Sequence, residues 1–334
     1  MSRIGVVAIG RNEGERLIRC LKSLKTQLPD GPIVYVDSGS TDGSPARAES
    51  LGVKVIHLDM SLPFTMARGR NAGFDDLTEH NSELEYVQFI DGDCELLPGW
   101  LEAAQTALDE NQQLAIACGR RRERFPEASP YNRLADMEWN TPIGEAKACG
   151  GDALMRIWAI QEVNGFNPTL ICGEEPEMCI RLRNRGWKIQ RLNVDMTLHD
   201  AAMTKVSQWW KRSIRGGWAI AEGVAMYGNS PEQYMRREHL SGWLWGALLP
   251  ITALMLLPFT FGVSLLLLVA YLLLGWRIYR HRCEYGDSPQ HAKTYAFWCV
   301  LSKLPQVIGQ SRYWLTQWRG QPATLIEYKS ATET

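Results

Sequence analysis

The sequence predicts an α/β domain with a mostly parallel, doubly wound sheet, followed by a helical region that associates with a membrane. Three observations predict this. Short apolar runs alternate with amphipathic helical patterns over the first half of the chain. Acidic residues directly follow two of these runs. Residues 240–276 contain no Lys, Arg, Asp or Glu.

Length and composition restrict the class of protein. A chain of 334 residues suits about two folding units, which we place at residues 1–204 and 205–334. With 45% hydrophobic residues the chain can build a core, so global disorder is excluded. A formal net charge of −1 leaves no positive excess for a dedicated nucleic-acid binder. Eight scattered cysteines without a C-x-x-C pair, and no visible secretory signal, favour a reducing, cytoplasmic setting for the first part.

The elements of the first half follow from residue periodicity. Short β-branched or apolar runs predict strands at residues 4–9, 33–36, 53–57 and 86–90. Apolar residues at helical spacing predict helices at residues 13–25, 45–51, 68–77 and 100–111. Residues 112–200 are less regular, with a helix predicted at 178–185 and a strand at 187–192.

Acidic residues mark the expected ligand-binding edge of the sheet. Asp37 and Asp91 end two predicted strands, and ligands bind beyond the carboxyl ends of strands in such sheets. The carboxylates of Asp91 and Asp93 can hold a hard divalent cation. The triplet Asp91-Gly92-Asp93 also occurs in ordinary turns, but its position after a buried strand favours a cation-binding site. Residues 37–42 either bind a base or ribose or cap the next helix.

Three further segments each allow a functional and a structural interpretation. The acids at 174, 175 and 177 either stabilise a helix N-terminus or include a general base whose pKa is raised by its neighbours. His199 is either structural or a third contact to metal or phosphate. Residues 120–124 are rich in arginine, and form either a solvated face or a site for a phosphorylated acceptor.

The uncharged segment 240–276 is nearly long enough for two membrane crossings of about 20 residues each. Pro258 lies near its middle, and arginines flank both ends, which favours a hairpin with both ends cytoplasmic. A buried helical hairpin of a soluble protein is the alternative. Tryptophans border the segment, as at a membrane interface: Trp209, Trp210, Trp218, Trp243, Trp245, Trp276, Trp298, Trp314 and Trp318.

Taken together, the motifs of residues 4–200 resemble the family 2 glycosyltransferases, which have the GT-A fold. Five segments carry the resemblance, in chain order: VAIGRNE at 7–13, VDSGSTDGS at 36–44, ARGRNAG at 67–73, DGD at 91–93 and GEEPEM at 173–178. Ser38 replaces one acid of the second motif, and Glu175 replaces the commoner Asp of the last. The resemblance implies inverting transfer of a sugar from a nucleotide-diphosphate sugar of UDP or GDP type.

The resemblance also implies roles for individual residues. Mg2+ or Mn2+ would bind Asp91 and Asp93, and Glu175 would be the base, with Glu174 beside it. From its position after a predicted strand, we expect His199 as a further metal ligand. The residues expected to bind the donor are Ala8, Asn12, Glu13, Asp37, Asp42, Arg70 and Asp91. Those expected to bind the acceptor are Arg120, Arg121 and Glu177.

A hydroxyl acceptor needs a base, whereas a polyprenyl phosphate does not. The pair Glu174 and Glu175 therefore favours a hydroxyl acceptor, which we expect on a lipid-linked glycan. Residues 208–212 (QWWKR) depart from the Q-x-x-R-W motif of processive synthases, which predicts single additions. We therefore expect an enzyme of exopolysaccharide or cell-surface glycan synthesis at the cytoplasmic face of the inner membrane. The alternatives are a non-catalytic sugar-nucleotide sensor or scaffold, a polyprenyl-phosphate glycosyltransferase and a nucleotidyltransferase.

Overall fold

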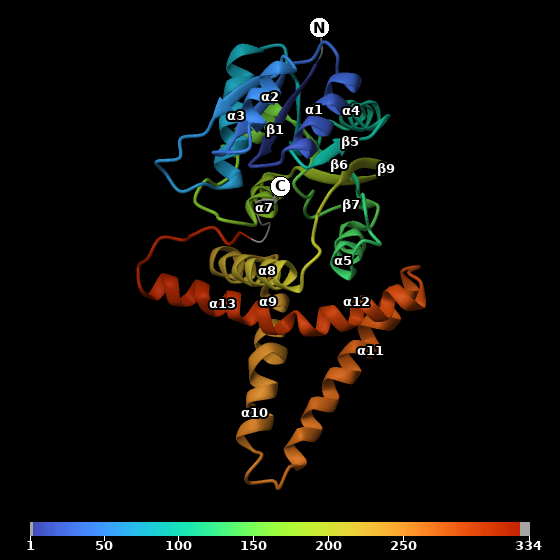
Figure 1. The fold of residues 1–334 in the computed structure, drawn as a ribbon, viewed down its shortest axis with the longest axis vertical. Helices are drawn as coiled ribbons and strands as arrows, with labels where there is room; N and C mark the ends of the chain where they lie inside the picture. The colour runs from blue at the N-terminus through green and yellow to red at the C-terminus, as the bar shows by residue number, and fades with distance from the viewer. Residues whose placement is uncertain (1–2, 328–334) are drawn as a thin grey trace. The chain divides into compact units, whose positions relative to one another are not determined.

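The computed structural model describes residues 3–327, which form two compact units. The first unit comprises residues 3–126 and 135–202, and the second comprises residues 127–134 and 203–327. Figure 1 labels the helices and strands of both units.

The first unit is built on one mixed sheet. Its strands are β1 (Ile4–Gly10), β2 (Ile33–Asp37), β3 (Lys54–His57), β4 (Tyr86–Asp91), β5 (Cys94–Leu96), β6 (Leu114–Glu123), β7 (Gly144–Glu145), β8 (Ala153–Arg156) and β9 (Lys188–His199). They lie in the order β3-β2-β1-β4-β8-β6-β9-β5, and β7 also pairs with β9. Its helices are α1 (Glu15–Gln27), α2 (Ser44–Ser50), α3 (Met66–His80), α4 (Trp100–Glu110), α6 (Ile157–Glu162) and α7 (Glu174–Asn184), while α5 (Pro130–Trp139) begins in the second unit.

The sheet is less parallel than the sequence predicts. The β1–β2, β2–β3, β1–β4 and β6–β9 pairs are parallel, as expected for strands joined through helices. However, β8 runs antiparallel to both β4 and β6, and β5 and β7 run antiparallel to β9. The prediction of a mostly parallel sheet is therefore wrong for the strands β5, β7 and β8. Of the strands that residues 112–200 contribute, the sequence predicts only the beginning of β9, at residues 187–192.

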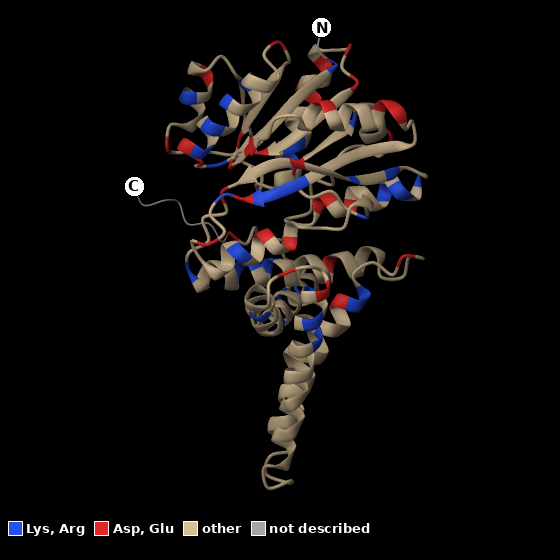
Figure 2. Ribbon diagram, turned by 90° about the vertical axis from the view of Figure 1, so that its right-hand side faces the viewer, with Lys and Arg blue, Asp and Glu red and all other residues tan. Residues whose placement is uncertain are grey.

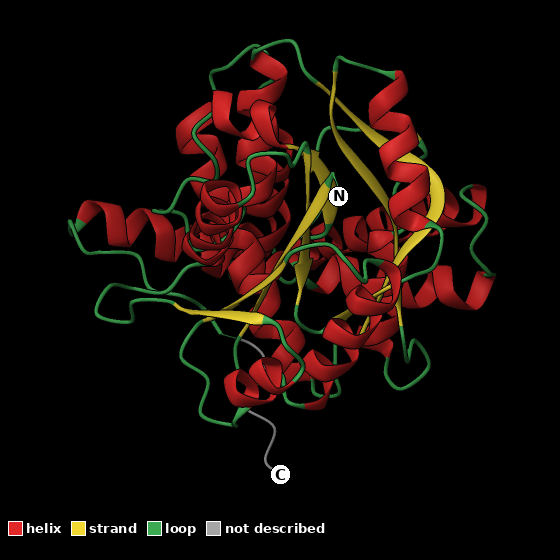
Figure 3. Ribbon diagram, turned by 90° about the horizontal axis from the view of Figure 1, so that it is seen from above, coloured by secondary structure: helices red, strands yellow, loops and turns green. Residues whose placement is uncertain are grey.

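Helices cover both faces of the sheet, which explains the continuous apolar runs of the central strands (Figure 3). In β1, Val6 and Ala8 join the core shared with α1 and α4. Val7 and Ile9 join the core on the opposite face, which contains residues of α3, α6 and α7. Each strand thus stabilises two apolar layers through its alternating side chains.

The two predicted acidic strand ends lie on either side of the end of β1. Asp37 is the last residue of β2 and pairs with Gly10, and Asp91 is the last residue of β4 and pairs with Ile9. The prediction that both acids end parallel strands at one edge is confirmed. This edge is where the loops of the first unit bring polar residues together.

The second unit is helical and contains an apolar hairpin (Figures 1 and 2). Its helices are α8 (Val206–Tyr227), α9 (Arg236–Trp243), the π-helix η1 (Leu244–Leu248), α10 (Leu249–Met255), the 3-10 helix η2 (Val263–Leu268), α11 (Val269–Glu284), α12 (Pro289–Leu301) and α13 (Lys303–Trp318). The chain turns between α10 and η2, around the predicted Pro258. Figure 2 shows no charged residue in the projecting part, and arginines cluster where it joins the other helices.

The hairpin leaves large apolar side chains exposed. Leu266 and Leu272 are 67% and 72% exposed, and Phe261 at the turn is 97% exposed. Within residues 3–327, one helical segment, Val263–Glu284, is long and apolar enough to cross a membrane by length and composition. Only 6% of the most apolar 18-residue stretch of this segment is buried, whereas the core helix of a soluble protein is mostly buried.

The tryptophans of the second unit divide into two groups. Trp209 and Trp218 are each only 4% exposed. The Trp209 ring lies 4.6 Å from that of Trp298, and the Trp218 ring lies 5.3 Å from that of Tyr313, so these rings hold α8 to α12 and α13. Others remain exposed, with Trp276 at 58% and Trp318 at 83%. The prediction that the tryptophans lie at a membrane interface therefore does not hold for Trp209 and Trp218, which pack inside the second unit.

Candidate active site

The carboxylate of Asp91 lies between two arginines at the end of β4. Its Oδ1 accepts from Arg70 Nη2 at 2.8 Å, and its Oδ2 lies 3.4 Å from Arg121 Nη2. Burial alone would raise the pKa of Asp91, but the two guanidinium groups outweigh it and hold that pKa below its ordinary value. Asp91 is therefore ionised and fixed in orientation.

Arg70 connects the end of β4 to the beginning of α7. It projects from α3 and is only 2% exposed. Its Nη1 donates to Glu174 Oε1 at 2.6 Å while its Nη2 binds Asp91. Because one planar guanidinium serves both carboxylates, the acidic helix start and the DGD segment lie on two sides of the same group.

Asp152 forms the buried support of this site. It is fully buried, and its Oδ1 accepts from the backbone N–H of Asp91 at 3.0 Å. Its Oδ2 lies 2.8 Å from Arg121 Nη2 and accepts from Thr197 Oγ1 at 2.8 Å. The Arg121 guanidinium also lies over the ring of Trp139, 5.5 Å from its centre. The carboxylate of Asp152 thus joins the loop before β8 to the strands β4, β6 and β9.

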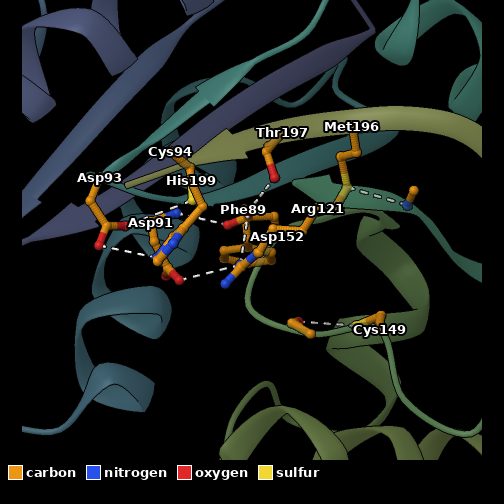
Figure 4. A network of polar contacts seen from close by, with 12 residues as sticks. Phe89, Asp91, Asp93, Cys94, Arg121, Cys149, Asp152, Met196, Thr197 and His199 are labelled. Carbon is orange, nitrogen blue, oxygen red and sulfur yellow. Dashed lines mark hydrogen bonds and ion pairs between the residues drawn. The ribbon is translucent and has the colours of Figure 1, made fainter. Parts of the chain in front are cut away.

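Asp93 and His199 form the part of the site that could hold a cation (Figure 4). His199 Nε2 lies 3.2 Å from Asp93 Oδ2, and both residues are buried. The Cys94 thiol completes a group whose ligand atoms lie within 4.8 Å of one another. A carboxylate and an imidazole together suit Mn2+ and similar divalent ions, so the donor set fits the predicted metal. The ring of Trp139 packs edge-on against His199, with centres 4.6 Å apart.

Gly151 leaves the space that these groups occupy. A Cβ at this position would lie 2.8 Å from Asp91 Oδ2, 3.0 Å from Arg70 Nη2 and 3.1 Å from Arg121 Nη2. Any side chain would displace the carboxylate or its arginines, so the close approach requires glycine.

The first turn of α7 presents three buried acids in different environments. Glu174 is paired with Arg70, and Glu177 is paired with Arg181 through both carboxylate oxygens at 2.9 and 2.8 Å. Glu175 instead accepts at Oε1 from the backbone N–H of Cys149 at 2.5 Å and from two thiols. Burial raises the pKa of Glu175 above its ordinary value despite these hydrogen bonds.

The predicted donor loop is held by its own acids. Asp37 Oδ2 accepts from the backbone N–H of Gly39 at 3.0 Å and of Ser40 at 2.9 Å. Asn12, at a positive φ of 55°, accepts from the Thr41 N–H at 2.7 Å. These bonds tie the turn after β1 to the turn after β2 and fix the backbone at the edge of the sheet.

The remaining residues predicted to bind the donor lie in the two turns and in the strand β1. Asp42 accepts from the N–H groups of Gly14 and Ser44, each at 3.0 Å, and so joins the same two turns. Glu13 is paired with Arg16 at 2.9 Å. Ala8 lies fully buried in the core of β1, so its side chain is not at an accessible surface.

The residues predicted to bind an acceptor are not brought together as a group. Arg120 is paired with Asp136 at 3.1 Å, and Arg121 points to Asp91 and Asp152. Glu177 is buried beside Arg181 on α7. The structure thus places Arg121 next to the predicted metal site.

Sequence reasoning missed several members of the site. Asp152 and Cys149 lie on either side of a Gly-Gly pair, and this GGD segment is the only sign of them in the sequence. Trp139 lies on α5, where neither spacing nor composition singles it out. The contacts of these residues depend on β8 and β9 entering the same sheet as β4.

Comparison with known proteins identifies part of the chain. Residues 6–156 match the family model described as "Glycosyl transferase family 2". A TPR repeat-containing protein of Synechococcus elongatus is 32% identical over 143 residues, which are 42% of this chain and 33% of that protein. The pre-mycofactocin glycosyltransferase of Mycobacterium tuberculosis is 25% identical over 217 residues, which are 60% of this chain and 44% of that enzyme. The chain therefore spans less than half the length of these relatives.

Two solved structures resemble the fold. The mannosyltransferase PcManGT of Pyrobaculum calidifontis, in complex with GDP-Man and Mn2+, has a TM-score of 0.60 at 14% identity. That likeness covers 93% of this chain and 87% of the other. The glucosyl-3-phosphoglycerate synthase of Mycobacterium tuberculosis, in complex with Mn2+, UDP and phosphoglyceric acid, has a TM-score of 0.50 at 19% identity, covering 66% of this chain and 77% of that chain. At these identities the likeness concerns the fold alone.

Proposed function

Because residues 6–156 match the family model of family 2 glycosyltransferases, we propose that this chain belongs to that family and transfers a sugar from a nucleotide-diphosphate sugar to an acceptor hydroxyl, with inversion at the anomeric carbon. The observation that carries the proposal is the environment of Glu175. Of the three acids in the first turn of α7, Glu174 and Glu177 are each neutralised by an arginine, whereas Glu175 is held by an amide and two thiols. A buried carboxylate with a raised pKa suits a general base.

A divalent cation, Mg2+ or Mn2+, is proposed at Asp93 and His199, with Asp91 as a further ligand, so that the ion would bind the donor diphosphate. The donor set supports this, and the two solved structures of similar fold are complexes with Mn2+ and with GDP-Man or UDP. When bound, such an ion supplies positive charge that offsets the charge developing on the departing diphosphate.

The chain's own residues then perform the displacement. The turns fixed by Asp37, Asn12 and Asp42 hold the nucleotide at the edge of the sheet. Arg70 fixes Glu174 relative to Asp91, which places the base at the same edge as the donor. Glu175 accepts the proton of the acceptor hydroxyl as that oxygen attacks the anomeric carbon, and the bond to the diphosphate breaks with its electron pair. One base and one displacement give inversion.

The second unit supports a membrane-bound acceptor. The exposed apolar hairpin between arginine-rich ends suits a bilayer, with both ends on the cytoplasmic side of the inner membrane. We therefore propose a lipid-linked glycan as acceptor and a role in exopolysaccharide or cell-surface glycan synthesis. A single hairpin encloses no channel for a growing polymer, which supports single additions.

The proposal is tested by nucleoside-diphosphate release from a panel of UDP- and GDP-sugars, using the full chain with Mn2+ and a membrane-lipid extract. We expect release with one donor that requires both the extract and the cation. The product should carry one added sugar with inverted anomeric configuration. Tight donor binding without release from any donor would instead support a sensor, and long polymer would contradict single additions.

A further inference from the structure

Two cysteines surround the proposed base in the first unit. Cys149 Sγ and Cys179 Sγ each lie 3.0 Å from Glu175 Oε1 and 3.9 Å from each other. The backbone N–H of Cys149 donates to the same oxygen at 2.5 Å. Cys149 comes from the loop before β8, and Cys179 lies one turn along α7 from Glu175. Three donors from two segments therefore converge on one carboxylate oxygen.

The thiols are suited to act as hydrogen-bond donors. Burial raises the pKa of Cys179 to about 11, and it raises the pKa of Cys149 well above its ordinary value. Both thiols therefore keep their protons at neutral pH and can donate. A carboxylate that receives such donors is stabilised in its charged form without a counterion.

This arrangement solves a conflict in the proposed mechanism. A base must be ionised to accept a proton, but Glu175 is only 6% exposed and burial penalises its charge. An arginine would favour the charge and also neutralise the base, as happens at Glu174 and Glu177. Neutral donors favour the ionised form while leaving the group basic.

We propose that Cys149 and Cys179 are positioning residues for the transfer reaction: their thiols fix Glu175 through Oε1 and direct Oε2 to the acceptor hydroxyl. The inference rests on the proposed function, since it assumes that Glu175 is the base. The other titratable groups acting on this cluster are Glu174, which disfavours ionisation of Glu175, Arg183, which lowers the pKa of Cys179, and the thiol of Cys118 on β6. Burial raises the pKa of Cys118 to about 12, so this thiol is neutral at the pH of the test and places no charge near Glu175.

The test compares alanine and serine variants of the full chain by the pH dependence of kcat at saturating donor. Cys149→Ala with Cys179→Ala removes both side-chain donors, so the pKa of Glu175 rises and the acid limb of the profile moves up by about one pH unit. The double serine variant keeps two donors and should restore the limb to within about 0.3 units of wild type.

The matched control is Cys118→Ala, a buried cysteine whose thiol lies 3.5 Å from the carbonyl of Gln190 rather than beside Glu175. It makes a cavity of the same kind, and we expect its profile to keep the wild-type acid limb. If the double alanine variant fails to fold, Cys179→Ala alone should give a smaller shift in the same direction.

An unshifted acid limb in the alanine variants, with kcat reduced no more than in Cys118→Ala, would overturn the inference and leave the cysteines as packing residues. Failure of the proposed function gives a different result, because the wild type itself would then release no nucleotide from any donor. Activity retained in Glu175→Gln would show that another group is the base. An inactive Glu175→Gln together with unshifted cysteine variants would reject only the positioning role.

Discussion

Replacing Arg70 by methionine tests whether one buried guanidinium holds the site together. The substitution keeps a long, flexible side chain but removes the hydrogen bonds to Glu174 at 2.6 Å and to Asp91 at 2.8 Å. Removing one partner of a buried ion pair costs about 3–5 kcal/mol, because the other charge stays buried without compensation. Since the Asp91 side chain is 25% exposed and water can reach it, we expect the lower end, about 3 kcal/mol.

The assay is thermal unfolding of the full chain, followed by intrinsic tryptophan fluorescence, to which the fully buried Trp100 of the first unit contributes. For a unit of this size, 1 kcal/mol shifts the melting temperature by about 2–4 °C, so Arg70→Met should lower it by about 6–12 °C. Arg47→Met is the control, because Arg47 pairs with Glu15 at the surface and such pairs contribute about 0–1 kcal/mol.

A loss in Arg70→Met no larger than that in Arg47→Met would refute the reasoning. It would mean that the two carboxylates are accommodated without the guanidinium, and that Arg70 does not connect the helix start to the end of β4.

Three further predictions concern other parts of the chain. Gly151→Ala places a methyl group 2.8 Å from Asp91 Oδ2, so nucleotide release should fall at least tenfold with little change in donor range. Burial raises the pKa of Glu222 to about 7 from 4.5. Its folded form thus binds the proton more tightly than the unfolded form, and its contribution to stability is full below pH 4.5 and lost as pH rises through about 7. Glu222→Gln should therefore flatten the decline of melting temperature over that range. Leu266→Arg puts a charge on the exposed apolar hairpin, at a cost of about 2.5–3.5 kcal/mol in a bilayer. The membrane-bound fraction of this variant should therefore fall in flotation assays, whereas Leu266→Ala should float like wild type.

The first half of the fold could be predicted because its signals are local. Apolar runs such as that of β1 pack on both faces of the sheet, so they remain readable without knowledge of their neighbours. Asp37 and Asp91 end their strands in the sequence as well as in the structure. The pattern of apolar residues locates the end of a buried strand, and therefore also the turn that follows it.

The second half of the site depends on contacts between segments far apart in the sequence. The sequence predicts that Arg121 either lies on a solvated face or binds the acceptor, whereas the pairing of β6 with β8 and β9 turns it toward Asp91. The sequence predicts a helix from Met178, but α7 begins at Glu174 with Pro176 inside its first turn. Proline is tolerated there because the first N–H groups of a helix have no partner within it.

The most direct test of the account compares Glu175→Gln with wild type in two measurements on the full chain: donor binding and the rate of sugar transfer. Glutamine keeps the shape of the side chain and removes the basic oxygen. If Glu175 is the base, the variant should keep a donor affinity within about threefold of wild type and transfer sugar at least about 100-fold more slowly, which is the usual contribution of a general base. A transfer rate within tenfold of wild type would contradict the assignment of Glu175 as the base.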